Sequence, residues 1–154
     1  MAAEYVVFKL GNEEYGMDIS AVNAIENMDG VTRIPNAPKY ILGIINLRGT
    51  VVPVYSLRIK FGMPEKDIDE KTQMIIARSY DQSGELVGYK ADTVSGIMEF
   101  QDDEISEIPV IVKNDRTAYA KKVAKRDGRL IILLDQNSML SDSEKKTIEK
   151  ITNN

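Results

Sequence analysis

Five carboxylates gathered in one stretch are the residues best placed to do chemistry. Glu99, Asp102, Asp103, Glu104 and Glu107 fall within nine positions. Paired carboxylates can hold Mg²⁺ or act as general acid and base. The stretch lacks the central Gly and the twelfth-position Glu of an EF-hand loop, which excludes a calcium site of that kind. A carboxylate hydrolase is therefore one hypothesis, and a solvated charged loop is the simpler interpretation.

The sequence contains neither His nor Cys. This excludes Ser-His-Asp and Cys-His nucleophilic sites, and the zinc, haem and iron–sulfur sites that depend on those ligands. The sequence also has no GxGxxG motif, P-loop or nucleophile elbow. We therefore expect no enzyme activity, no cofactor and no metal.

The sequence has one basic cluster, formed by Lys121, Lys122, Lys125 and Arg126. The chain as a whole has a net charge of −4 and contains no Trp. Nucleic-acid binding needs more extensive cationic surface and stacking aromatic side chains. The cluster is therefore expected to be the solvent face of a strand, with no nucleic-acid partner. Without an apolar run of about 18 residues or a signal-peptide pattern, we predict a cytoplasmic protein that does not insert into membranes.

Two groups of residues are candidates for binding another protein. Arg48 stands at the tip of an expected hairpin, where Gly49 permits the positive φ of a tight turn. An arginine on a rigid turn suits protein recognition, although a solvated turn residue is the commoner case. Val22 and Ile25 have helical spacing, so the pattern predicts a short amphipathic helix over 19–26 whose stripe is either core or part of a groove for a partner helix.

The elements that must position these residues are mostly strands. A polar segment at 62–71 is expected to connect two halves of the chain, and a capping signal at Ser141 and Glu144 predicts a short C-terminal helix over 141–150. The fold class is therefore all-β with short helices. Strands are predicted within 4–10, 44–57, 72–79, 85–92, 94–100, 117–125 and 129–135.

The two halves of the sequence repeat one another. Gly16 precedes Val22 and Ile25 by the same spacings that separate Gly88 from Val94 and Ile97. The run 49–54 likewise matches the run 128–133. Units of about 70 residues are marginal alone, so the repeat predicts two small barrels packed over a shared apolar core.

Several motifs give the chain a family resemblance. In the first half these are FKLGxEEYGxDI at 8–19, RIP at 33–35 and GIINLRGTVVPV at 43–54. The second half adds Gly88-x-x-x-Asp92-x-Val94 and the closing run GRLIILLD at 128–135. Together they resemble the CheW-like domain of bacterial chemotaxis coupling proteins over essentially the whole chain. The resemblance implies a single domain over 1–154, made of two interleaved or consecutive five-stranded SH3-like barrels.

The resemblance also implies a function. It is that of a non-enzymatic adaptor that couples the cytoplasmic tips of methyl-accepting chemoreceptors to the regulatory domain of the histidine kinase CheA and helps to assemble the signalling array. The alternative is a detached CheW-like regulatory module of a kinase or of another two-component pathway. The implied partner-binding residues are Arg48 with its neighbours Asn46, Leu47 and Gly49, then Val22 and Ile25 in the receptor-facing groove, and their second-half counterparts Val94 and Ile97.

The sequence departs from the family at two positions. Lys122 stands where many relatives have Gly, which predicts a differently built turn there. Ala24 stands where the family often has Glu, so the nearest carboxylate is Glu26. Both departures bear on partner contacts.

Overall fold

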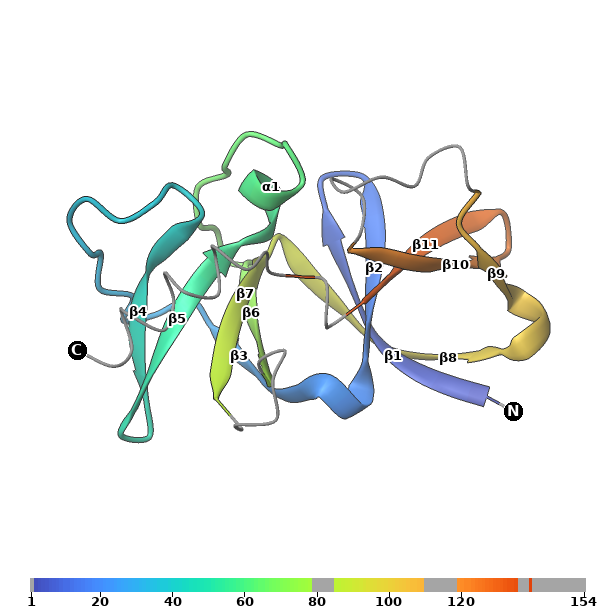
Figure 1. Ribbon diagram of the computed structural model, residues 1–154, viewed down its shortest axis with the longest axis horizontal. Helices are drawn as coiled ribbons and strands as arrows, with labels where there is room; N and C mark the ends of the chain where they lie inside the picture. The colour runs from blue at the N-terminus through green and yellow to red at the C-terminus, as the bar shows by residue number, and fades with distance from the viewer. Residues whose placement is uncertain (1, 79–84, 110–118, 136–138, 140–154) are drawn as a thin grey trace.

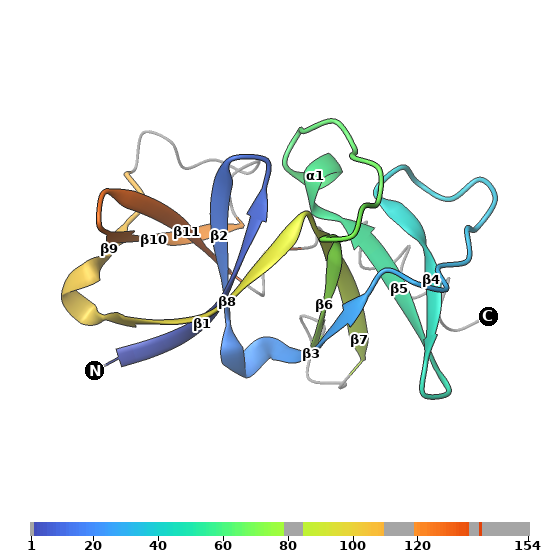
Figure 2. The ribbon, with the colours of Figure 1, turned by 180° about the vertical axis from the view of Figure 1, so that it is seen from behind.

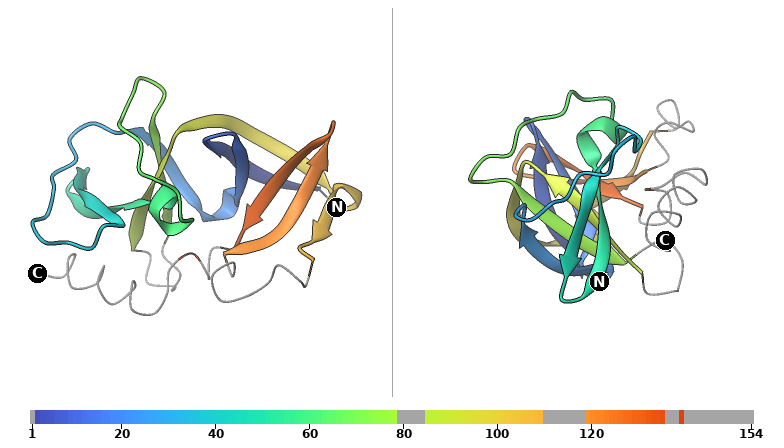
Figure 3. Two further views of the ribbon diagram at one scale, coloured as in Figure 1. Left: turned by 90° about the horizontal axis from the view of Figure 1, so that it is seen from above. Right: turned by 90° about the vertical axis from the view of Figure 1, so that its left-hand side faces the viewer.

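The computed structural model describes residues 2–78, 85–109, 119–135 and 139. Over these ranges the chain forms two β-sheets that lie side by side along the long axis of the molecule (Figure 1 and Figure 3). The all-β prediction is confirmed. The helix predicted over 141–150 lies outside the described residues.

The first sheet has five strands: β3 (Val22–Asn27), β4 (Ile41–Leu47), β5 (Thr50–Ser56), β6 (Gln73–Arg78) and β7 (Leu86–Ala91). Their spatial order is β3-β6-β7-β5-β4. A 3-10 turn, η1 (Ile19–Ala21), precedes β3, and the one-turn helix α1 (Leu57–Lys60) follows β5. The hydroxyl of Ser56 caps α1 by accepting a hydrogen bond from the Ile59 amide at 3.2 Å.

The second sheet has six strands: β1 (Ala2–Leu10), β2 (Glu13–Asp18), β8 (Thr93–Gln101), β9 (Ile105–Glu107), β10 (Ala120–Arg126) and β11 (Arg129–Leu134). Their order is β8-β1-β2-β11-β10-β9. A 3-10 turn, η2 (Asp102–Glu104), joins β8 to β9. The resemblance implied five strands here, and the sixth is β9, which pairs with β10 at the edge of the sheet.

Alternation along the strands divides the apolar side chains between three cores. On β1, Val6 and Phe8 face a core shared by both sheets, whereas Val7 faces the interior of the six-stranded sheet. On β6, Ile75 faces the shared core and Met74 faces the interior of the five-stranded sheet. Because successive side chains of a strand point to opposite faces, these strands are covered on both sides. Each sheet thus curls around its own interior as a barrel, and the two barrels pack over a common core, as the repeat predicted.

The repeat is visible in the topology as well. With β9 set aside, the orders β8-β1-β2-β11-β10 and β3-β6-β7-β5-β4 match position by position. Each sheet contains one parallel pair, β2 with β11 and β7 with β5, and the repeated glycines, Gly16 and Gly88, lie in those pairs. Each barrel combines the first two strands of one repeat with the third, fourth and fifth strands of the other. The two repeats are therefore interleaved, and Figure 2 shows β8 running from beside β7 into the six-stranded sheet.

The segment 62–71 connects the two halves of the chain, but it does not connect the two sheets. It joins α1 to β6, and the strands on either side of it, β5 and β6, belong to the same sheet. The chain passes between the sheets at η1 and again between β7 and β8. A polar, proline-containing segment indicates solvent exposure, but it carries no information about which sheets it joins.

The amphipathic helix predicted over 19–26 is also wrong. Asp18 does cap a helical turn, because its Oδ1 accepts from the amide and the hydroxyl of Ser20 at 2.9 and 2.8 Å. That turn ends at Ala21, and β3 follows, paired with β6. Pairing along six residues of sheet edge outweighs the helical spacing of three apolar side chains.

The acidic stretch at 99–107 is not a loop. It forms the end of β8, the turn η2 and the edge strand β9. The side chain of Glu104 returns to accept a hydrogen bond from the Gln101 amide at 2.9 Å, which fixes the turn.

Candidate partner-binding surface

The turn between β4 and β5 holds Arg48 in a strained and well-defined position. Arg48 and Gly49 have φ values of 53° and 88°, and the strand pairing closes on Leu47 and Thr50. Two successive residues with positive φ make the tight hairpin turn that matches the twist of the flanking strands. The side chain of Asn46 accepts a hydrogen bond from the Gly49 amide at 2.8 Å. The turn therefore presents the Arg48 side chain, 75% exposed, on a rigid support.

Arg48 forms an ion pair with Glu26, with Nη2 and Oε1 3.4 Å apart. Glu26 lies on β3 and Arg48 follows β4, and these two strands are the opposite edges of the five-stranded sheet. The ion pair therefore spans the two edges where the barrel closes. A cleft of about 430 Å³ opens beside it, lined among others by Glu26, Asn46, Leu47 and Asn27. Sequence reasoning noted Glu26 only as the carboxylate nearest to Ala24, because nothing local links it to a residue 22 positions away.

Val22 and Ile25 lie on a strand and not on a helix, but they do share one face, where they pair with Ala77 and Ile75 of β6. Val22 is partly buried against the shared core, whereas Ile25 points outward and is 38% exposed. Ala24 packs against the interior of the five-stranded barrel. Val22 and Ile25 therefore lie on the same face of β3, opposite to Ala24, because a bulge between Val22 and Ala24 shifts the alternation. Ile25 is the part of this face that a partner can reach.

Val94 and Ile97 repeat this arrangement on β8. Val94 stands opposite Phe8 and packs against the shared core, and Ile97 is 57% exposed. β3 and β8 are each the edge strand of their own sheet. The sequence repeat therefore extends to the burial of individual side chains. One pair of positions on each barrel offers a half-buried valine and an exposed isoleucine.

A second ion pair, which sequence reasoning missed, fastens the two barrels together. Arg58, in α1, donates from Nε and Nη2 to the carboxylate of Asp92 at 2.9 and 2.5 Å. The same carboxylate accepts from the Gly11 amide at 2.7 Å, in the turn between β1 and β2. Burial alone would raise the pKa of Asp92, but the hydrogen bonds from Arg58 and Gly11 outweigh it and hold the pKa below its ordinary value. The Gly88-x-x-x-Asp92 motif was the available signal.

The basic cluster and the acidic stretch partly neutralise each other. Arg126 pairs with Glu104 at 3.1 Å and its guanidinium lies over the ring of Phe100, 4.8 Å from the centroid. Lys122 lies 3.8 Å from Glu107. In the parts of the chain that the structure describes, no three or more acidic side chains are grouped so that they could hold a metal ion.

The hairpin between β10 and β11 is the counterpart of the Arg48 turn. Asp127 and Gly128 have φ values of 51° and 78°, close to those of Arg48 and Gly49. The turn that Lys122 was expected to alter is instead a bulge within β10, between Ala120 and Lys122. Lys122 is not among the described residues with positive φ, so glycine is not needed there.

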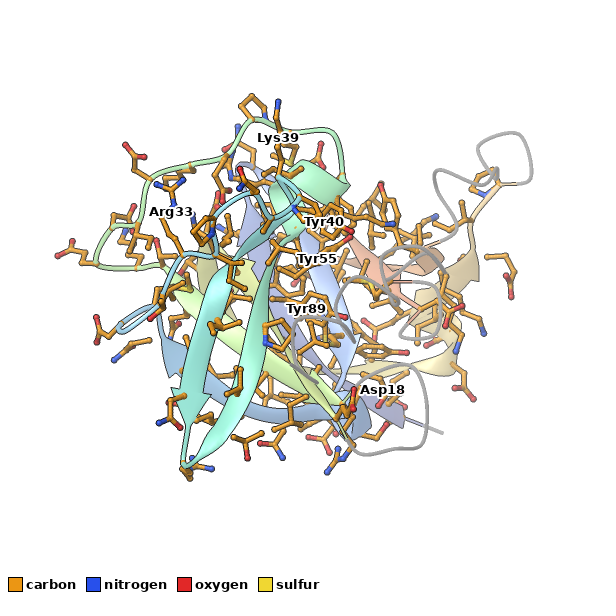
Figure 4. All side chains as sticks on the ribbon, turned by 60° about the vertical axis from the view of Figure 1, so that its left-hand side comes forward. Asp18, Arg33, Lys39, Tyr40, Tyr55 and Tyr89 are labelled. Carbon is orange, nitrogen blue, oxygen red and sulfur yellow. The ribbon has the colours of Figure 1, made fainter. Side chains whose placement is uncertain are left out.

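Figure 4 labels three tyrosines of the shared core together with residues of the outer loops. Tyr40 and Tyr55 pack with tilted rings, 5.3 Å between centroids, and Tyr55 and Tyr89 pack edge to face at 5.7 Å, all within the shared core. Arg33 and Lys39 lie on the loop before β4, and Asp18 lies at the other side of the molecule in this view. None of the helices within the described ranges has the length and apolar character needed to cross a membrane.

Comparison with known proteins is consistent with this architecture. The CheW-like domain family matches residues 4–144. The chain is 36% identical to the chemotaxis protein CheW of Klebsiella aerogenes, an alignment covering 96% of this chain and 87% of that protein. It is 33% identical to the chemotaxis protein CheW of Bacillus subtilis, covering 88% of this chain and 85% of that one. The crystal structure of the scaffolding protein TtCheW from Thermoanaerobacter tengcongensis superposes with a TM-score of 0.81 and 31% identity, over 92% of this chain and 94% of that one. The chain, with its interleaved barrels and its Asn-Leu-Arg-Gly turn, belongs to the CheW-like domain family of chemotaxis proteins.

Proposed function

We propose that this protein is a non-enzymatic adaptor that couples the cytoplasmic tips of chemoreceptors to the histidine kinase CheA. Relatives named as chemotaxis and scaffolding proteins support the proposal. So does the lack of His and Cys, since an adaptor needs no nucleophile. The protein would act in the cytoplasm, recruited to arrays of membrane-bound receptors.

The observation that carries the proposal is the Arg48 turn. Arg48 has a left-handed backbone conformation, and its turn is held by the hydrogen bond between Asn46 and Gly49. Its guanidinium also pairs with Glu26 across the closure of the barrel. The side chain is therefore ordered before another protein binds. Preorganised groups lose less entropy on binding than mobile ones. Arg48, Asn46, Leu47 and Gly49 therefore make a suitable surface for the regulatory domain of the kinase.

The exposed isoleucines suit the other partner. A receptor tip is a helical hairpin, and a helix is recognised through apolar side chains repeated along one of its faces. Ile25 and Ile97 each project from an edge strand, and the half-buried Val22 and Val94 lie three residues earlier on the same strands. We propose that the receptor helices lie against these positions. Coupling is then geometric, because one rigid body holds both partners at a fixed separation.

A titration followed by backbone amide shifts tests the proposal. Isotope-labelled protein is titrated with a receptor-tip fragment and, separately, with the regulatory domain of CheA. We expect shifts at Val22, Ile25, Val94 and Ile97 with the receptor fragment and at the Arg48 turn with the kinase domain. A folded sample that shifts with neither partner would contradict the proposal.

A matched pair of variants sharpens this test. Ile25→Ala removes an exposed apolar side chain from β3 and is expected to weaken receptor binding by about tenfold, or about 1.4 kcal/mol. Leu130→Ala removes one from β11, where Leu130 is 61% exposed and outside the proposed surface. Leu130→Ala should leave receptor binding unchanged. Equal losses from both variants would mean that general surface hydrophobicity, and not this site, binds the receptor.

A further inference from the structure

A groove of about 930 Å³ lies on the five-stranded barrel at the end of β4 away from the Arg48 turn. Its walls are the loop between β3 and β4 and the segment that follows α1. β4 begins at Ile41 in the groove wall and ends at Leu47 beside the turn. At about 3.3 Å per residue, the groove and the turn lie roughly 20 Å apart. None of the partner-binding residues predicted from the sequence lines the groove.

The groove is positively charged on an acidic protein. Its charged lining comprises Arg33, Lys39, Lys66 and Lys90 against Glu65 and Asp67, whereas the whole chain has a net charge of −4. Lys66 pairs with Asp69 at 3.1 Å. Arg33 and Lys39 form no ion pair or side-chain hydrogen bond with any described residue. They lie on the same loop (Figure 4), so two uncompensated cations mark one lip of the groove.

A buried cation stands in the wall. Lys90 is only 6% exposed, and its Nζ lies 3.5 Å from Glu65 and donates to the backbone carbonyl of Lys66. An ion pair in a partly buried site interacts more strongly than one in open water, because the local dielectric is lower. A carboxylate entering the groove therefore meets one buried cation, which is paired with Glu65, and the two exposed cations Arg33 and Lys39.

The rest of the lining is apolar. It includes Met28, Val31, Ile34, Leu42, Ile59 and the largely exposed Ile68. A free inorganic anion would leave these side chains in contact with water, and none of the aromatic side chains on which nucleic-acid bases stack lines the groove. The volume is at the upper end of the range of small-ligand pockets, about 300–1,000 Å³. An occupant with both carboxylates and aliphatic side chains satisfies both parts of the lining.

We propose that this groove docks an acidic peptide segment of a partner protein, with aliphatic side chains on Met28, Leu42 and Ile68 and carboxylates toward Arg33 and Lys39. The site is separate from the surfaces assigned above to receptor and kinase. Its charge is opposite to that of the chain as a whole, so it also selects against a basic partner.

The test uses the full chain and three fluorescent synthetic peptides: alternating Glu and Leu, alternating Glu and Ser, and alternating Lys and Leu. Binding is followed by fluorescence anisotropy at low and high salt and located by amide shifts. We expect the Glu-Leu peptide to bind most tightly, to shift the amides of Arg33, Lys39, Leu42 and Ile68, and to lose affinity as salt increases.

The matched variants are R33E/K39E and K121E/K125E. Lys121 and Lys125 are exposed on β10, so both pairs of substitutions change the net charge equally. R33E/K39E should lower the affinity for the Glu-Leu peptide by about tenfold or more, whereas K121E/K125E should change that affinity by less than about twofold. The proposal would be overturned if the two double variants lowered the peptide affinity equally. It would also be overturned if the folded protein bound no peptide at millimolar concentration, or if the amide shifts lay outside the groove. Binding of phosphatidylserine vesicles but of no peptide would assign the groove to a membrane surface instead, and a concentration-dependent dimer that excludes the peptide would assign it to a second copy.

Discussion

At the scale of single residues, Arg48 separates stability from binding. Replacing it with Gly relieves the strain of the left-handed backbone conformation. The substitution also increases the conformational entropy of the unfolded chain and removes the exposed ion pair with Glu26. Relief of the backbone strain stabilises the fold by about 1 kcal/mol, whereas the more flexible unfolded chain and the lost ion pair each destabilise it by up to about 1 kcal/mol. We expect Arg48→Gly to change the free energy of unfolding by less than about 1 kcal/mol while weakening kinase binding by about tenfold. Chemical denaturation and calorimetric titration measure the two quantities.

Asp127→Gly is the matched control for that substitution. Asp127 has nearly the same φ in the equivalent turn between β10 and β11. Its substitution should change stability as little as Arg48→Gly does, and should leave kinase binding intact. If Arg48→Gly unfolds the protein, then the turn is needed for the fold and the loss of binding says nothing about recognition.

Asp92 should make stability depend on acid pH. Its pKa in the folded protein lies below the ordinary value of 3.8, so the folded state favours the ionised carboxylate. The stabilisation is complete above pH 3.8 and is lost as the pH falls below it toward the folded pKa. Asp92→Asn leaves Arg58 without its carboxylate and should cost about 3 kcal/mol at neutral pH.

Urea unfolding between pH 2 and pH 7 measures this effect. The Asp92→Asn curve should fall less steeply below pH 4 than the curve of the unaltered protein. Asp103→Asn, in the exposed turn η2, should follow the unaltered protein throughout. Parallel curves for Asp92→Asn and the unaltered protein would show that the interbarrel ion pair does not contribute to acid unfolding.

The residues that sequence reasoning found are those whose signal is local. The Asn46-Arg48-Gly49 turn was predicted because its geometry depends on adjacent residues. The Glu26 and Asp92 partnerships were not, since each joins elements that only the fold brings together. Pairing across a barrel closure has no sequence period from which it could be inferred.

At the scale of elements, Gly43 is needed for the close approach of the loop before β4. A Cβ there would lie 2.3 Å from the carbonyl oxygen of Thr32, which pairs with the Ile44 amide at 2.8 Å. The φ of Gly43 is also 153°, which other residues rarely adopt. Gly43→Ala should therefore cost about 3 kcal/mol or more, because backbone and not a flexible side chain must move.

Gly30→Ala is the control for Gly43→Ala, because it carries the cost of a positive φ without a steric clash. Gly30 also has a positive φ, 74°, but a Cβ there would have no atom within 4 Å. Its substitution should cost only about 1–2 kcal/mol. Thermal denaturation of both variants compares them. Similar losses would mean that the Thr32 bridge does not constrain Gly43, and with it the groove wall.

The segment 19–26 shows why element type was harder to predict than element position. Its ends were located correctly by the Asp18 cap and the breakers that follow, but the spacing of Val22 and Ile25 favoured a helix. A spacing of three residues does not fit the two-residue alternation of a regular strand. The bulge between Val22 and Ala24 brings both side chains onto one face, and nothing in the sequence indicates it. The strand forms because the edge of β6 pairs with β3 from Asn27 to Val22, with one bulge between Ala24 and Val22. Strands such as 129–134, with five apolar residues in succession, carried no such ambiguity.

At the scale of the whole molecule, sequence reasoning detected two similar units but not how they share strands. A sequence repeat shows that two segments form the same elements. It does not show whether the strands of one repeat pair with each other or with strands of the other repeat. The polar segment 62–71 separates the two repeats along the chain, but the two sheets do not divide there. In the structure the third, fourth and fifth strands of each repeat, β3, β4 and β5 or β8, β10 and β11, complete the sheet of the other repeat. The shared core joins both.

Interleaving predicts that neither half folds alone. Cutting the chain between Asp67 and Ile68, in the exposed connection, leaves fragment 1–67 with β1 to β5 and fragment 68–154 with β6 to β11. Each sheet then lacks strands, and each fragment exposes the unpaired edges and apolar faces that its partner covers. We expect each fragment to be unfolded by amide spectra, and an equimolar mixture to regain the dispersed spectrum and a single cooperative melting transition. Fragment 1–67 that folds by itself would contradict the prediction. A mixture that stays unfolded would show that strand exchange alone cannot hold the fold without the covalent connection.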